Sequence, residues 1–131
     1  MSAQQGSHGG KAGTDLADIP KFVSVDDHVI EPPHVWTDRL PSKYADVMPR
    51  TVRMRGVMRF VGGVFSFEET DDGDEADWWQ YEDGRYPLTR LECAVGFDRS
   101  EVTVSGITYD QMRKGCWDPK ARLEDMDVNW T

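Results

Sequence analysis

The stretch "RMRGVMRFVGGVFSFEET", residues 53–70, contains two runs rich in β-branched and aromatic residues on either side of Gly62 and Gly63. Strands favour such residues, and tight hairpin turns require the positive φ angles that glycine adopts easily. The stretch therefore predicts a β-hairpin whose strands cover residues 52–61 and 64–69.

The segment that follows, residues 70–90, reads "TDDGDEADWWQYEDGRYPLTR" and mixes an acidic cluster with aromatic residues. We expect a long loop here, and loops of this length inside a compact domain are usually functional lids or are disordered. Its residues Trp78, Trp79 and Tyr81 could line an apolar pocket. Aromatic residues that cover a small core would give the same pattern.

Upstream of the hairpin, Phe22–Val25 predicts a short strand that is buried on both faces and is followed by Asp26, Asp27 and His28. Side chains alternate along a strand, so Asp26 and His28 point to the same side. Carboxylate oxygen and imidazole nitrogen are ligands that suit Zn, Mn or Fe(II). Asp26 and His28 are therefore candidate metal ligands. The alternative is that the pair only satisfies backbone groups of the adjoining loop.

Two prolines, Pro32 and Pro33, keep the next polar residues out of regular structure. Glu31 could contact the metal ligands without binding the metal itself, or it could be a solvated acid. His34 is predicted to lie on the surface or to pack in a loop.

The two ends of the chain have contrasting patterns. Residues 1–19 are dominated by small and polar residues, which predicts a disordered tail. Near the other end, Asp118 is a good N-cap and Pro119 a good first helical residue, so we expect a helix over residues 119–127.

Composition limits the class of protein. The chain has 131 residues and a formal net charge of -9, which opposes binding to nucleic acid or to anionic membranes. Its two cysteines, Cys93 and Cys116, lack zinc-type spacing and favour a reducing compartment. The first twenty residues contain no apolar run, so no signal peptide is predicted and a cytoplasmic location is expected.

Several phrases together resemble the TIM-barrel metal-dependent hydrolases of the amidohydrolase superfamily, in the branch related to aminocarboxymuconate semialdehyde decarboxylase. They cover most of the chain after residue 20, in the order expected for the N-terminal part of such a protein. The phrases are "VSVDDHVIEPPHVWTDRLPSKY" at 23–44, "FVGGVFS" at 60–66, "DWWQYED" at 77–83, "PLTRLECAVGFDR" at 87–99, "ITYDQMRKG" at 107–115 and "RLEDMDVN" at 122–129.

The resemblance implies an α/β fold in which residues 20–131 are the N-terminal part of a (β/α)8 TIM barrel. Phe22–Val25 would be its first strand, 45–117 an insertion that contains the hairpin, and 119–127 its first helix. A complete barrel takes about 250 residues, so this domain would be incomplete. Asp26 and His28 would match the first metal pair of the family, with zinc as the first choice and Mn or Fe as alternatives.

The resemblance further implies an enzyme that hydrolyses C–N or C–O bonds, or that decarboxylates a small carboxylic acid without oxidation. The remaining ligands and the general base would lie on later strands, so we expect the 131-residue chain to be inactive alone. Its partners would be a small-molecule substrate and either a chain that carries the rest of the barrel or further copies of itself. The alternative is a non-catalytic small subunit, or a truncated gene product, that needs a partner chain.

Overall fold

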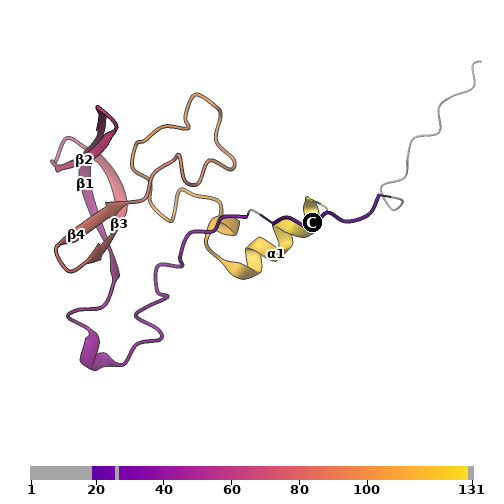
Figure 1. The fold of residues 1–131 in the computed structure, drawn as a ribbon, viewed down its shortest axis with the longest axis horizontal. Helices are drawn as coiled ribbons and strands as arrows, with labels where there is room; N and C mark the ends of the chain where they lie inside the picture. The colour runs from indigo at the N-terminus through magenta and orange to yellow at the C-terminus, as the bar shows by residue number, and fades with distance from the viewer. Residues whose placement is uncertain (1–18, 26, 130–131) are drawn as a thin grey trace, which may run out of the picture.

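A four-stranded antiparallel sheet occupies the middle of the chain and defines the fold (Figure 1). This computed structural model describes residues 19–25 and 27–129. The strands lie in the order β2-β1-β3-β4. Their bounds are β1 Arg50–Val61, β2 Val64–Glu69, β3 Asp74–Tyr81 and β4 Gly84–Pro87. The other elements are the 3₁₀ turns η2 (Ser42–Tyr44) and η3 (Lys114–Cys116) and the helix α1 (Pro119–Val128).

The structure confirms the predicted hairpin. β1 and β2 pair as far as Val61 and Val64, and the turn between them consists of Gly62 and Gly63 with φ angles of 61° and 81°. Glycine adopts such angles without the steric cost that a Cβ would add. The strand β1 begins at residue 50 instead of residue 52 because it also pairs with β3 along its first half.

The sheet curls at Gly56, the residue of β1 that pairs with both neighbouring strands. The ring of Phe67 covers the position that a Cβ at Gly56 would occupy. The centroid of the Phe67 ring lies 3.5 Å from the ring centroid of Trp78. Phe67 and Trp78 belong to strands that are not adjacent, so their contact requires strong curvature. Arg85 of β4 and Glu69 of β2 join the two edges through an ion pair of 2.8 Å. The sheet is therefore a half-barrel.

The main apolar core lies beside β3, between the sheet and the irregular chain that follows β4. Backbone hydrogen bonds hold this chain in place, from Asp77 N to the Ile107 oxygen (3.1 Å) and from Ile107 N to the Leu88 oxygen (3.0 Å). The buried members of the core are Ile30, Leu88, Cys93, Ile107, Tyr109 and Met112.

The predicted C-terminal helix is confirmed as α1. Asp118 is its N-cap, and the Asp118 side chain accepts hydrogen bonds from Lys120 N (2.9 Å) and Ala121 N (3.3 Å). Pro119 occupies the first helical position, where the missing N–H has no helical partner to lose. No helix among the described residues is long and apolar enough to cross a membrane.

The predicted fold class, an N-terminal fragment of a (β/α)8 TIM barrel, is wrong. The described residues form a small β-rich fold with one short helix and no alternation of strands and helices. The region that we expected to be an insertion, residues 45–117, contains the whole sheet. The reason is that apolar and polar residues alternate along its segments, as in half-buried strands. These segments pair with one another, so the sheet needs no strand from outside residues 45–117.

Two local predictions are also wrong. Phe22–Val25 forms no strand, and its side chains are exposed instead of buried on both faces. Residues 70–90, predicted as a loop, contain β3 and β4, because Asp74–Tyr81 pairs with the first half of β1 and Gly84 begins a second hairpin. The predicted tail covers residues 1–19, of which 1–18 lie outside the described residues.

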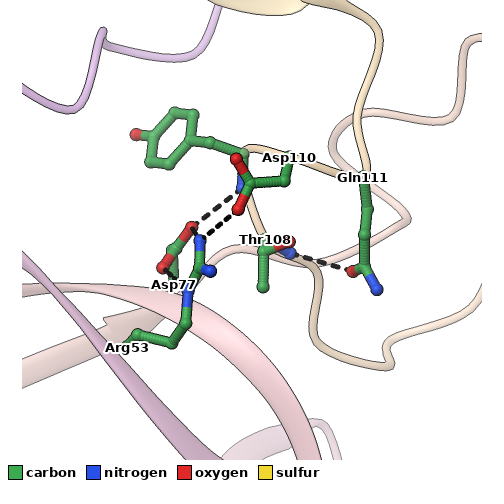
Figure 2. A network of polar contacts seen from close by, with 6 residues as sticks. Arg53, Asp77, Thr108, Asp110 and Gln111 are labelled. Carbon is green, nitrogen blue, oxygen red and sulfur yellow. Dashed lines mark hydrogen bonds and ion pairs between the residues drawn. The ribbon is translucent and has the colours of Figure 1, made fainter.

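A buried carboxylate ties the sheet to the chain beyond it (Figure 2). Asp77, only 6% exposed, accepts hydrogen bonds from Arg53 Nε (2.9 Å), Arg53 Nη2 (3.0 Å) and Tyr109 N (2.8 Å). Arg53 also donates to Asp110 at 2.7 Å. These two carboxylates raise the pKa of Arg53 above its ordinary value, with the hydrogen bond to Asp77 as the largest cause.

We expect Asp77→Asn to lower the free energy of unfolding by about 1–3 kcal/mol, because it removes a charge and an acceptor from a buried network. Asp110→Asn is the matched control. The Asp110 side chain is 75% exposed, so the loss there should stay below about 1 kcal/mol. Urea unfolding followed by circular dichroism measures both values. Equal losses in the two variants would contradict the special role of Asp77.

Candidate functional site

A cavity of about 690 Å³ lies between the segment that precedes the sheet, the end of β4 and the helix α1. Its volume falls within the range of small-molecule sites. Polar and charged groups enter it from all three sides. They belong to His28, Glu31, Tyr86, Glu92 and Arg122, while Trp36, Trp79, Leu88, Leu91, Cys93 and Cys116 add apolar or weakly polar surface.

Two long-range hydrogen bonds position the segment that carries His28 and Glu31. Ile30 N donates to the Cys116 oxygen at 2.8 Å, and the Tyr109 hydroxyl donates to the backbone oxygen of Glu31 at 2.7 Å. Burial raises the pKa of Tyr109, so its hydroxyl remains a donor across the ordinary pH range. The wall of the cavity is thus attached to the core at residues 30 and 31.

Glu92 forms a second fixed wall. Its carboxylate accepts hydrogen bonds from Thr89 N (2.9 Å), Thr89 Oγ1 (3.1 Å) and the Tyr86 hydroxyl (2.8 Å). The bond to Glu92 is the largest cause that raises the pKa of Tyr86. These contacts hold Tyr86 protonated and orient both side chains where they line the cavity.

The positive charge at the cavity comes from Arg122 of α1. Its guanidinium lies 2.7 Å from the Asp27 carboxylate, and the Asp27 side chain is 40% exposed. The Arg122 side chain is 26% exposed and lines the cavity, so its guanidinium is partly screened by solvent and can be reached from the cavity.

Three of the predicted site residues, His28, Glu31 and Trp79, line the cavity. Trp78 does not, because it points to the other face of the sheet and packs against Phe67. Tyr81 is exposed at the end of β3.

The other candidates fall elsewhere. Asp26 lies outside the described residues, so its predicted alignment with His28 stays a prediction. His34 is exposed and is not among the residues that line the cavity, as expected for a surface position.

The described residues do not complete a metal site. Residues 19–25 and 27–129 contain no group of three or more His, Cys, Asp or Glu side chains that could hold an ion. A catalytic zinc normally has three protein ligands. Of the two predicted ligands, His28 is the one that the structure describes. No chemical step through a metal follows from this geometry.

Several cavity residues were missed in the sequence. The spacing of Thr89 and Glu92, three apart, is that of a capping pair and could have indicated a fixed carboxylate. Arg122 and Cys116 carry no such local signal, because they reach the cavity only through tertiary packing.

Comparison with known proteins adds no relative. No protein-family model matches the chain, and no significant match to a curated protein was found.

The buried thiol at the cavity predicts a pH dependence. Burial is the main cause that raises the pKa of Cys93 from its ordinary value of about 9 to about 12. The folded state therefore prefers the neutral thiol, and this contribution to stability is present below pH 9 and is lost as the pH rises toward 12. We expect the free energy of unfolding to fall over that interval.

Cys93→Ser separates this effect from other alkaline changes. Serine keeps a donor for the Thr89 oxygen, which the Cys93 thiol contacts at 3.1 Å, but it does not ionise in this range. Urea unfolding from pH 8 to pH 11 should therefore show a shallower decline in the variant. The same decline in both proteins would contradict the assignment to Cys93.

Proposed function

We propose that the chain forms part of the active site of a metal-dependent hydrolase, or of an enzyme that decarboxylates a small carboxylic acid without oxidation. The observation that carries the proposal is that His28 and Glu31 line the same cavity as Trp79, a residue from a distant strand. The sequence pattern had singled out all three, and the cavity has the size of a small-molecule site.

The charges at the cavity suit an acidic substrate. The guanidinium of Arg122 can pair with a substrate carboxylate in place of the exposed Asp27, and Trp79 and Leu88 give it an apolar wall. Arginine binds carboxylates well because its donors form a planar fork. The proposal therefore includes binding of a small carboxylic acid, or of an ester or amide that releases one.

The metal of the proposal is zinc, with Mn or Fe as alternatives, and His28 is the described residue that can bind it. Asp26 stays the second predicted ligand and lies outside the described residues, and the described residues supply no group of three ligands, so the proposal takes the remaining ligands and the general base from another chain. We therefore propose that the chain is inactive until another polypeptide completes the site.

A cytoplasmic location belongs to the same proposal. Cys93 and Cys116 are both free thiols, as expected in a reducing compartment.

The proposal predicts weak, His28-dependent metal binding. Calorimetric titration of the full chain with Zn²⁺ should give a Kd on the order of 100 µM or weaker, about -5.5 kcal/mol or less favourable, because too few ligands are present. His28→Ala should weaken this binding at least about tenfold, or abolish it, since it removes the one described ligand.

His34→Ala is the control for the titration. His34 is exposed and is not among the residues that line the cavity, so its removal should leave the affinity unchanged. Equal effects of the two substitutions would refute the assignment of His28 as a ligand. Binding of Zn²⁺ at micromolar affinity by the chain alone would refute the need for further ligands.

A second candidate function is a non-catalytic subunit that acts through a partner chain. The observation that favours it is the exposure of Phe22, Val23 and Val25, which are 62%, 87% and 93% exposed. Three exposed apolar side chains within four residues form a patch of the kind found at interaction surfaces. A chain that binds neither Zn²⁺ nor carboxylates, but associates through this segment, would support the second candidate over the first.

A further inference from the structure

A second cavity, of about 320 Å³, lies between the two outer strands of the half-barrel, β2 and β4. Aromatic rings line it from both strands, those of Phe65 and Phe67 from β2 and that of Tyr86 from β4. The other apolar side chains of its lining are Met58, Pro87, Leu91 and Val104. The cavity is therefore mostly apolar, with aromatic rings on two sides.

The charged side chains of the described lining, Arg85 and Glu92, are both paired within the chain. Arg85 donates a hydrogen bond of 2.8 Å to Glu69. Glu92 accepts the hydrogen bonds from Thr89 and the Tyr86 hydroxyl that are described above. An anionic ligand would have to compete with Glu69 for Arg85 and would be repelled by Glu92, while a cation would be repelled by Arg85. The lining therefore favours a neutral ligand.

Three features of the lining favour an aromatic ring over an aliphatic group of the same size. Aromatic rings attract one another in offset or edge-to-face arrangements, which Phe65 and Tyr86 can form with a ligand. The guanidinium of Arg85 attracts the face of an aromatic ring. The sulfur of Met58 adds a further favourable contact with a ring.

The volume limits the size of the ligand. A space of about 320 Å³ equals the liquid volume of roughly ten water molecules, at about 30 Å³ each. It is thus large enough for one ring system and lies at the lower end of the range of small-molecule sites.

We infer that the cavity between β2 and β4 binds a neutral aromatic molecule of about ten non-hydrogen atoms. This is a second site, because His28, Trp79 and Arg122 line the first cavity and not this one. The two cavities share a wall that consists of Tyr86, Leu91 and Glu92. The inference goes beyond the proposed function and does not depend on a metal or on another chain.

The first experiment titrates the full chain with indole, a neutral aromatic molecule of about this size, and follows the binding by NMR. Binding should be saturable, with a Kd on the order of 100 µM to 1 mM. Phe65→Ser should weaken it at least about tenfold, because this change removes an aromatic wall and opens the cavity. Binding that does not saturate would overturn the inference.

Phe60→Ser is the matched control. Phe60 and Phe65 are both 56% exposed, and their ring centroids lie 4.4 Å apart, so either substitution removes the same ring contact. Phe60 does not line the cavity, and its loss should change the Kd of indole less than about twofold. Equal weakening by the two substitutions would overturn the inference.

The second experiment tests the class of ligand by displacement of bound indole. Benzyl alcohol, cyclohexylmethanol and benzoate are similar in size, but the second lacks the aromatic ring and the third carries a charge. Benzyl alcohol should displace indole at a concentration at least about threefold lower than either of the others. Equal displacement by cyclohexylmethanol would overturn the preference for an aromatic ring, and stronger displacement by benzoate would overturn the preference for a neutral ligand.

The third experiment separates this site from the proposed metal site. His28→Ala should leave the affinity for indole unchanged, because His28 does not line the second cavity. A loss of indole binding in this variant would place indole in the first cavity and overturn the inference. A chain that binds Zn²⁺ through His28 but binds no indole would overturn the second site and leave the metal proposal standing.

Discussion

The buried carboxylate of Asp77 is the contact on which the rest of the structure depends. A carboxylate that is buried without donors is strongly destabilising, so its three hydrogen bonds must form together. Two of them fix β1 against β3 through Arg53, and the third brings the backbone of Tyr109 to the sheet. Tyr109 in turn donates to the backbone of Glu31. The position of the cavity wall therefore follows from a contact made at the sheet.

The sequence predicted correctly those elements whose position depends on a few neighbouring residues. The hairpin follows from the two glycines at its turn, and the start of α1 follows from Asp118 and Pro119, so each could be located from a few neighbouring residues. The strand β3 was missed because Asp74–Tyr81 begins with acids and follows a glycine, which resembles a loop. Pairing with the first half of β1 overrides that composition. No local pattern could reveal this partner.

The site was predicted only in part, because some of its residues are brought together by tertiary packing. Alternation along a strand separates Trp78 from Trp79, and only Trp79 reaches the cavity. His28 and Glu31 lie on a segment whose polar character was visible in the sequence. Arg122 reaches the same cavity from α1, and nothing in the sequence connects these two regions. The barrel expected from the resemblance failed because residues 45–117 form a sheet of their own.

The exposed residues Phe22, Val23 and Val25 and the candidate site lie on one short segment, which links the two candidate functions physically. Ile30 is buried and is held by the Cys116 oxygen, whereas the described residues 20–25 and 27–29 before it are exposed. His28 therefore lies on the outer side of the first buried anchor of this segment. Association through residues 22–25, as in the second candidate function, would restrain the chain on both sides of His28 and so reduce the entropy lost when a ligand binds there. Completion of the site and association through residues 22–25 would then favour each other, because the same ordering of the segment serves both.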